Sequence, residues 1–418
     1  MPELLSVSKA QSIILDAIQT LATELIPIQS ARSRRLATPI ITDTDLPPFT
    51  NSSADGFAVQ AADTLNASSA SPVVLTIIGD IPAGTNPAFR VNRGQAARIM
   101  TGAPLPEGAD AVVMVEATDI GIRGLAVPIP RQVRIFSPIL PGDSLRPRGQ
   151  DLTAGTQLFP AGHRLRPPDI GLLASLGIPQ VQVYRQPRIA LLSTGDELLD
   201  PSKPLQPGKI HDANSYLLAS VLQEHGAVIT HMGFVGDDEV AIRESLENYA
   251  ASGIDLLITS AGVSVGAYDY VRKIITEQGD LTFWRVNMRP GKPLAFGRFR
   301  NVPVIGLPGN PVSAFVSCLI FVLPALNKMS GAATWFLDSI HAKLLEPVES
   351  DGRESYLRAI LENQHGNWFV KLAGQQSSGN LFVLTRSNAL LILPSEVKSL
   401  PTGAEVNVYP LFPETGWD

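Results

Sequence analysis

The sequence predicts a multidomain α/β plus β protein, and three patterns lead to this fold class. Short β-like runs separated by Gly and Pro fill residues 46–145, strands alternate with helical patterns over 187–331, and strand-like alternation returns over 332–418. Residues 1–45 and 146–186 flank the first β-rich segment and carry mixed patterns. We therefore expect a discontinuous N-terminal α+β domain around a β-rich inserted domain, then a doubly wound α/β domain and a C-terminal β-barrel domain.

The first predicted helix covers residues 7–25. Apolar residues recur there at helical spacing, Ser8 is a suitable N-cap, and Pro27 is expected to stop the helix. A later apolar run, Val312–Leu323, is expected to end at Pro324. A run of this length is too short to cross a bilayer and fits a buried helix.

The 187–331 segment follows a strand, loop, helix rhythm. Its predicted strands are RIALLS, AVITHMGFV, IDLLITS, LTFWRVNM, PLAFGRF and VPVIGL, and its predicted helices are SYLLASVLQEHG, DEVAIRESLENYAASG and YVRKIITEQG. This alternation indicates a mostly parallel sheet with helices on both faces. Ligands of such sheets bind beyond the carboxyl ends of the strands, so the loops at that edge are the candidate site.

Composition narrows the class of protein. A hydrophobic content of 44% with 17% charged residues excludes global disorder, and the formal charge of −6 argues against a nucleic-acid partner. Cys318 is the single cysteine, which excludes a disulfide framework and suits a reducing compartment. The N-terminal residues lack a signal-peptide pattern. We expect a cytoplasmic protein that binds neither membranes nor nucleic acid.

Two loops at the expected sheet edge carry polar or small residues. Asp196 and Glu197 follow the first strand, where their carboxylates suit a hydrated Mg²⁺ or an oriented water; a turn cap and a solvated side chain are the alternative. After the third strand, Gly262, Ser264 and Gly266 allow backbone N–H groups to approach an anion.

Two further features flank the next helices. Asp269 either caps the helix that follows it or places a carboxylate beside the anion loop. In the third loop, Asn310 is the expected N-cap and Pro311 the first helical residue. Ser313 can then offer its N–H and its hydroxyl to an oxyanion. Structural capping alone is the alternative interpretation of this loop.

A basic stretch interrupts the acidic chain. Residues 272–300 hold seven basic and two acidic side chains, a local charge of +5. Arg289 and Lys292 stand on the rigid turn RPGKP, where they lose little entropy on binding phosphate or another oxyanion. A solvated basic face is the alternative. Together with the loops above, this stretch points to phosphoryl or oxyanion chemistry.

Ordered motifs along nearly the whole chain resemble one family, the molybdopterin molybdenumtransferases (the MoeA family and the corresponding domain of gephyrin). These motifs are DLPPFTNSSADGFAV, RIMTGAPLPEGADAVV, RGQDLTAG, LASLGI, STGDEL, GDD, SAGVSVGAYDY, RPGKPLAFG, GLPGNPVSAF and GQQSSGNL.

The resemblance implies an enzyme that inserts molybdate into the dithiolene of adenylated molybdopterin, with Mg²⁺-dependent cleavage of the adenylate and release of AMP. It implies a homodimer with an active site shared between subunits, to which the β-insertion contributes Asp55 and Thr101. Asp151 of RGQD also matches a functional position. A molybdopterin adenylyltransferase and molybdoenzyme acceptors are the further partners that the resemblance suggests.

The resemblance also suggests how the other matching residues divide the work. We expect Asp196, Asp238 and Asp269 to hold Mg²⁺, with Glu197 beside them in the catalytic group. The 262–266 loop binds the pterin phosphate.

On the basic turn, Lys292 is expected to bind the same pterin phosphate. Arg289 with Ser313 receives molybdate, and Asn310 belongs to the same substrate-binding set.

The sequence departs from the family pattern at Ala54, Phe57, Ala261 and Arg289, where Met, Tyr, Gly and often Lys are usual. Phe57 lacks the hydroxyl, so we expect no chemistry there. Ala261 adds a methyl beside the anion loop, and we expect it to be tolerated only if its φ is negative. Arg289 keeps the charge with a different geometry.

Two other functions compete with the transferase. A scaffold that keeps this fold and binds protein partners is one, but it need not retain STGDEL and RPGKP together. A molybdopterin adenylyltransferase, similar to the 187–331 segment alone, is the other, and the additional β domains argue against it.

Overall fold

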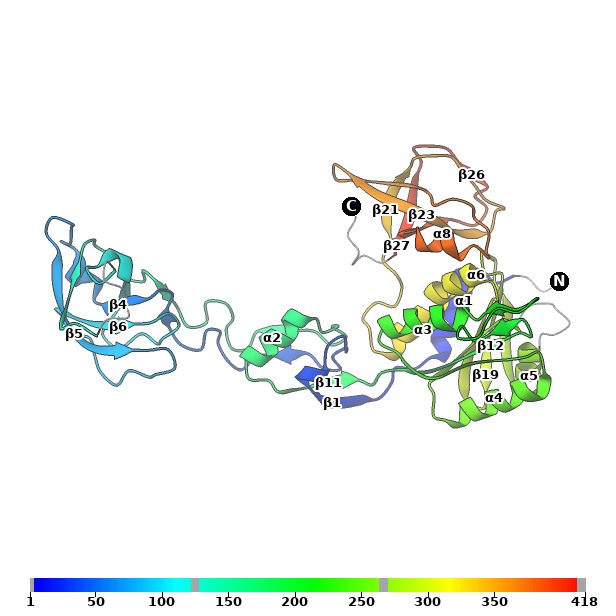
Figure 1. Cartoon of the computed structure of the whole chain (residues 1–418), viewed down its shortest axis with the longest axis horizontal. Coiled ribbons are helices and arrows are strands. Elements are labelled where there is room, and N and C mark those ends of the chain that lie inside the picture. The colour runs from blue at the N-terminus through cyan, green and yellow to red at the C-terminus, as the bar shows by residue number, and fades with distance from the viewer. Residues whose placement is uncertain (1–3, 122–127, 263–269, 412–418) are drawn as a thin grey trace. The chain divides into compact units, whose positions relative to one another are not determined.

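The computed structural model describes residues 4–121, 128–262 and 270–411 (Figure 1). The chain forms two compact units. The first comprises Met1–Thr38, Ala161–Gly171 and Pro179–Asp418, and the second comprises Pro39–Pro160 and Leu172–Ile178. The α/β and C-terminal segments belong to the first unit and the β-rich insertion to the second. The boundaries of four separate domains stay a prediction.

A six-stranded sheet forms the centre of the first unit. In spatial order its strands are β15 (Val228–Val235), β12 (Arg188–Thr194), β16 (Leu256–Ser260), β20 (Val302–Leu307), β19 (Pro293–Phe299) and β17 (Gly279–Arg285). The first four strands are parallel, whereas β19 runs antiparallel to β20, and β17 antiparallel to β19. The predicted mostly parallel sheet is present, with an antiparallel edge.

Helices cover both faces of this sheet (Figure 1). They are α3 (Asn214–Glu224), α4 (Glu239–Ala251), α5 (Tyr270–Gln278), α6 (Pro311–Ser317) and α7 (Leu323–Met329). Successive strand residues point to opposite faces. Ile189 and Leu191 of β12 belong to the core cluster that contains α3, α6 and α7, whereas Ala190 and Leu192 belong to the cluster of α4 and α5. This alternation confirms the doubly wound fold.

The apolar helix after β20 is longer than predicted. Pro324 does not end it, because the π-helical stretch Cys318–Val322 joins α6 to α7 and the Leu323 N–H bonds to the Cys318 carbonyl. The wider hydrogen-bond spacing lets the helix continue through a residue that lacks an N–H. Among the described residues, the continuous helix Pro311–Met329 is sufficiently long and apolar to cross a membrane. However, 89% of its most apolar 18-residue segment is buried inside the protein. It is a core helix.

The first helix is shorter than predicted. Helix α1 (Val7–Ala17) has Ser6, not Ser8, as its N-cap. The last predicted helical residues, 23–25, belong instead to β1 (Thr23–Pro27), which pairs antiparallel with β11 (Gln180–Tyr184). A strand partner that is distant in sequence overrides the local helical spacing here. The apolar face of α1 joins the core cluster of α7 and the sheet.

The C-terminal segment forms the predicted β-barrel. Its strands are β23 (Glu354–Gln364), β24 (Asn367–Leu372), β21 (Ile340–Leu344), β27 (Glu405–Pro410) and β25 (Ala389–Leu393), and β25 pairs back to β23. This last pairing closes the sheet. A short strand from the α/β segment, β18 (Met288–Arg289), pairs in parallel with the start of β23. The RPGKP turn therefore runs from the barrel into β19. The barrel also carries α8 (Leu381–Thr385) and the pair β22 (Val348–Glu349) and β26 (Ser399–Leu400).

The second unit contains a five-stranded sheet. Its order is β7 (Ala111–Met114), β4 (Gly56–Val59), β6 (Gln95–Ile99), β5 (Val73–Ile81) and β8 (Gln132–Ile135). Shorter pairs are β3 (Asn51–Ser52) with β9 (Leu145–Arg146) and β2 (Ile40–Ile41) with β10 (Gln157–Phe159). Helix α2 (Pro167–Ser175) follows β10. Phe57 is fully buried in the apolar core of this sheet. This position is compatible with the expectation that Phe57 has no chemical role.

Candidate active site

Two cavities adjoin at the carboxyl edge of the α/β sheet. The first, about 500 Å³, lies where the chain order reverses between β12 and β16, and the loop after β20 completes it. This is the position at which open α/β sheets bind ligands. The second, about 330 Å³, lies between the RPGKP turn and the barrel. Both are lined by Pro293, Asn310 and Ser313, so the two cavities share a wall.

The loop after β12 contributes Glu197 to the first cavity. The Glu197 carboxylate folds over Gly195, where an added Cβ would lie 2.5 Å from Oε2. Asp196 is exposed, and its Oδ1 accepts the backbone N–H of Asp237 at 3.0 Å. Its backbone carbonyl accepts a hydrogen bond from Lys209. The predicted carboxylate pair is present at this edge, with Glu197 in the cavity lining and Asp196 beside the next loop.

Asp238 follows β15, the neighbour of β12. Its Oδ1 accepts the backbone N–H of Ala241 at 2.8 Å and caps α4. Asp196 and Asp238 therefore lie on neighbouring loops, but no three His, Cys, Asp or Glu side chains gather as a metal-ligand group within residues 4–121, 128–262 and 270–411. Asp269, the third predicted Mg²⁺ ligand, lies outside the described residues. The magnesium set stays a prediction.

The loop after β16 places Gly262 in the lining of the first cavity, while Ser264 and Gly266 lie outside the described residues. The expectation that Ala261 requires a negative φ was wrong, because the structure has alanine there with a φ of 71°. Its N–H donates to the Leu307 carbonyl at 3.1 Å, which holds the loop against β20. The Ala261 methyl lies against Gly309, where an added Cβ would approach it to 3.1 Å. Ala261 therefore occupies a backbone conformation that favours glycine.

The loop after β20 opens α6 as predicted, with Asn310 at the N-cap position and Pro311 as the first helical residue. The Asn310 side chain does not cap the helix; its Nδ2 donates to Ser378 Oγ of the barrel at 3.1 Å. The Val312 N–H donates to the Ser378 carbonyl at 3.2 Å, so the barrel uses part of the helix terminus that we expected to face an oxyanion. Ser313 is 4% exposed and lines both cavities.

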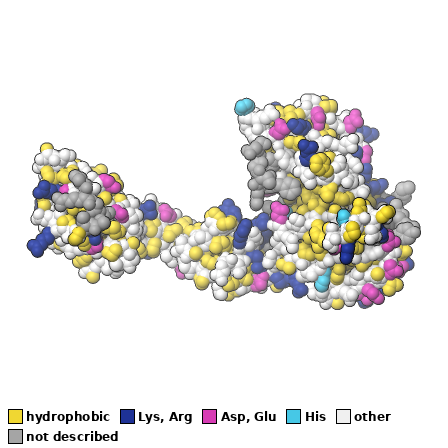
Figure 2. Space-filling model, in the orientation of Figure 1, with side chains coloured by type: hydrophobic (Ala, Val, Ile, Leu, Met, Phe, Trp, Pro, Cys, Tyr) yellow, Lys and Arg dark blue, Asp and Glu magenta, His cyan; other side chains and the backbone are white. Residues whose placement is uncertain are grey.

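The basic stretch 272–300 is not one ligand-binding face. Arg272 and Arg285 lie over the Trp284 ring, at 4.6 and 3.8 Å from its centroid. The remaining pairings outside the cavities are Lys273 with Glu239, Arg300 with Glu247, and Arg298 with the carbonyls of Ala17 and Asn301. Figure 2 shows acidic and basic side chains interspersed on the face that it draws. Of the seven basic residues, Arg289 and Lys292 line the second cavity.

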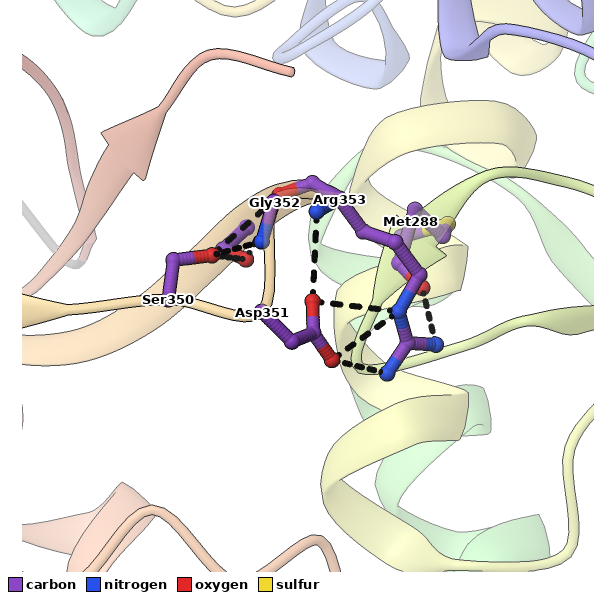
Figure 3. Close-up of polar contacts among 6 residues, drawn as sticks. Met288, Ser350, Asp351, Gly352 and Arg353 are labelled. Carbon is purple, nitrogen blue, oxygen red and sulfur yellow. Dashed lines mark hydrogen bonds and ion pairs between the residues drawn. The ribbon is translucent and has the colours of Figure 1, made fainter. Parts of the chain in front are cut away.

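The second cavity also contains basic side chains from the barrel, which the sequence did not predict. Arg353 pairs with Asp351 and donates to the Met288 carbonyl at 3.1 Å (Figure 3). Hydrogen bonding by Arg353 lowers the pKa of Asp351 despite partial burial, and the charge of Arg289 contributes. Within the described parts of the chain, neither Arg289 nor Lys292 forms a salt bridge, although the charge of Arg289 acts on Asp351 at longer range.

Arg358 is the second barrel residue that sequence reasoning missed. It is 2% exposed, and its guanidinium donates to the carbonyls of Gln375, Ser377 and Asn380 at 3.0, 2.9 and 3.2 Å. Burial lowers the pKa of Arg358. The motif GQQSSGNL contains these carbonyls and was the available signal, but nothing in it indicates which distant side chain it holds.

The predicted residues of the β-insertion lie in the second unit. The Asp55 carboxylate accepts both the backbone N–H and the hydroxyl of Thr101, each at 2.7 Å. These two hydrogen bonds lower the pKa of Asp55. Asp151 is exposed, and its backbone N–H donates to the Leu46 carbonyl at 2.9 Å. The structure therefore joins Asp55 to Thr101, and their role in a shared site stays a prediction.

Three family models match successive segments of the chain. The MoeA N-terminal region (domain I and II) matches residues 5–177, a probable molybdopterin binding domain matches 190–328, and the MoeA C-terminal region (domain IV) matches 341–411. A molybdopterin molybdenumtransferase of Nostoc sp. is 40% identical, with 93% of this chain and 89% of the relative aligned. The chain belongs to the MoeA family.

Further similar proteins support the same family assignment. Molybdopterin molybdenumtransferase 2 of Mycobacterium tuberculosis is 36% identical over 97% of this chain and 99% of its own length. Gephyrin of Dictyostelium discoideum is 32% identical over 96% of this chain and 61% of gephyrin. The crystal structure of a MoeA protein from Pyrococcus horikoshii superposes with a TM-score of 0.77 at 30% identity, covering 98% of this chain and 100% of that chain. The MoeA-family chain is thus a transferase of molybdenum cofactor biosynthesis, which confirms the resemblance.

Proposed function

We propose that this transferase inserts molybdate into adenylated molybdopterin and releases AMP, and that the two adjoining cavities are its substrate site. Membership of the family implies molybdate and molybdopterin as substrates. The observation that carries the proposal is the second cavity, which Arg289 and Lys292 line without forming a salt bridge to any of the described residues. Two such cations suit an oxyanion.

The RPGKP turn supports anion binding through its rigidity. It is held at one end by β18 on the barrel and at the other by β19 in the sheet, and the Val286 N–H donates to the Lys292 carbonyl at 3.0 Å. Side chains on a fixed turn lose little conformational freedom when they bind. We assign the pterin phosphate to Lys292 and the Gly262 loop, and molybdate to Arg289 with Ser313.

Mg²⁺ is the metal that the predicted carboxylates suit. Carboxylate oxygens are hard ligands, and protein-bound Mg²⁺ keeps several waters and needs only one or two carboxylates beside substrate phosphates. Asp196 and Asp238, on neighbouring loops, fit that requirement, with Asp269 as the third proposed ligand. The ion would supply charge neutralisation for the adenylate phosphates. Glu197, in the cavity lining, is placed to orient a water or a proton-bearing group.

The subunit arrangement belongs to the same proposal. We expect a cytoplasmic homodimer in which Asp55 and Thr101, with Asp151, complete the partner's site. The hydrogen bonds that fix the Asp55 carboxylate on Thr101 support a prepositioned charge. A molybdopterin adenylyltransferase that supplies substrate and molybdoenzymes that accept product are the proposed partners.

The direct test is molybdate-dependent release of AMP. Purified protein is incubated with adenylated molybdopterin, Mg²⁺ and increasing molybdate, and AMP is quantified by chromatography. We expect release that saturates with molybdate and stops when EDTA removes the metal. AMP release that is independent of molybdate, or none at all, contradicts the proposal. Mixed dimers of Asp55 and Lys292 variants test the shared site, since one intact site should restore partial activity.

A further inference from the structure

Two buried polar atoms in the lining of the first cavity lack a hydrogen-bond partner among the described residues. They are Thr194 Oγ1, at the end of β12, and Asn214 Oδ1, at the start of α3. Thr259 Oγ1 and Ser317 Oγ are also buried and unpaired within the described parts of the chain, but neither lines this cavity. An unpaired buried polar group is costly, and its retention at a ligand site suggests that a ligand pairs it.

The hydrogen bonds of Asn214 establish which of its amide atoms is unpaired. Its Nδ2 donates to the Gly309 carbonyl and to Ser260 Oγ, each at 2.7 Å. A carbonyl oxygen can only accept, so the atom facing Gly309 must be the amide nitrogen. The remaining Oδ1 is an acceptor only, so a ligand group that pairs it must donate a hydrogen bond.

The side of the first cavity on which Asn214 and Asp212 lie disfavours an anion. Asp212, 3% exposed, lines it; its Oδ1 accepts the Ser215 N–H at 3.1 Å and the Ser193 hydroxyl at 3.4 Å. The Glu197 carboxylate lies in the same lining. An anion here would meet two carboxylates, whereas a neutral N–H or O–H donor would meet acceptors.

We propose that Thr194 and Asn214 are specificity-determining residues that bind a neutral, hydrogen-bond-donating part of the substrate in the first cavity. The anionic part then lies between the Gly262 loop and Lys292, past Ser313, which lines both cavities. This orientation rests on the proposed function. The donating group has two sources in adenylated molybdopterin, the amide and amino edge of the pterin and the ribose or adenine of the adenylate.

Thr194→Val tests the proposal, with Thr259→Val as the matched control. Both changes replace a buried, unpaired hydroxyl by a methyl of similar size, one inside the cavity lining and one outside it. We expect the KM of Thr194→Val for adenylated molybdopterin to rise about fivefold, as for one lost hydrogen bond, with kcat within about twofold. Thr259→Val should keep both constants. Thermal unfolding of both variants should be unchanged or raised, which separates binding from folding.

Binding of simpler probes identifies the source of the donor. Calorimetry compares AMP, ribose 5-phosphate and pterin on the wild-type chain, Thr194→Val and Thr259→Val. Weaker binding of AMP and ribose 5-phosphate by Thr194→Val assigns the ribose, weaker binding of AMP alone assigns the adenine, and weaker binding of pterin alone assigns the pterin.

Two outcomes overturn the proposal. In the first, Thr194→Val matches the wild-type chain in KM and in binding of all three probes. In the second, Mg²⁺ titrated without substrate binds the wild-type chain but not Thr194→Val, which makes the unpaired atoms metal ligands. Absence of molybdate-dependent AMP release in the wild-type chain counts against the proposed function alone, since the probe binding is measured without turnover.

Discussion

The two cavities differ in chemistry although they share a wall. The first is lined by the carboxylates of Glu197 and Asp212 and by the amide oxygen of Asn214, all of which accept hydrogen bonds. The second is lined by Arg289 and Lys292, which donate them. A ligand that has a neutral, donating end and an anionic end can satisfy both, and a ligand with only one of them cannot. The difference therefore orients the substrate before any chemistry takes place.

The two cavities differ because different segments of the chain line them. Loops at the carboxyl edge of the parallel strands line the first cavity, and their residues follow one another at that edge. The second needs the barrel, whose Arg358 is held by three backbone carbonyls and whose Ser378 contacts Asn310. The cation-lined cavity thus depends on packing between distant segments of one unit.

Removing the Lys292 charge from the second cavity has the largest expected effect on activity. Lys292→Ala should lower kcat/KM for molybdate-dependent AMP release about 30-fold, because a charged hydrogen-bond donor is lost. Arg300→Ala is the control, since Arg300 belongs to the same basic stretch but pairs with exposed Glu247. Steady-state kinetics measure both. Equal activity of the two variants would place the anion elsewhere.

Freeing the positive charge of Arg353 in the second cavity should strengthen molybdate binding, by less than the loss of Lys292 weakens activity. Asp351→Asn releases Arg353 from its ion pair, and we expect the Kd for molybdate to fall about threefold. Arg353 lowers the pKa of Asp351 from 3.8, so the pair is present above that pH and is lost as pH falls through the lowered pKa. The difference between the variant and the wild-type chain should be constant from about pH 5 to 8 and shrink only as the pH falls through the lowered pKa of Asp351. Calorimetric titration of molybdate at several pH values measures it.

The smallest expected effect concerns the wall of the first cavity. Ala261→Gly removes a left-handed alanine, with φ of 71°, and should stabilise the protein by about 0.5 kcal/mol after the entropy of the added glycine is deducted. Ala213→Gly, where φ is −84°, lines the same cavity and should destabilise the protein by about 0.5–1 kcal/mol. Thermal unfolding distinguishes them by the sign of the change. A loss of stability in both variants would mean that Ala261 is not strained.

Sequence reasoning predicted best those parts of the candidate site that follow from the order of strands, loops and helices along the chain. Strand-loop-helix alternation located the loops of Glu197, Gly262 and Ser313 at one sheet edge, and the structure places all three in the first cavity. It failed for residues 23–25, which were predicted to be helical but belong to β1, and for the backbone of Ala261. In both cases a partner distant in sequence decides the conformation, β11 for the strand and the Leu307 carbonyl for the alanine.

The sequence by itself determined the fold class and the ordered motifs of the family, because apolar periodicity and turn residues act over a few neighbouring positions. It also predicted a charge of +5 over residues 272–300. Only the tertiary structure decided which of those charges face a ligand. Stacking on Trp284, ion pairs with glutamates and hydrogen bonds to backbone carbonyls engage the others, while β18 joins the barrel and leaves Arg289 and Lys292 at the second cavity. Long-range pairing has no signature within a short window of sequence, so the direction of a side chain there becomes known only when the fold is.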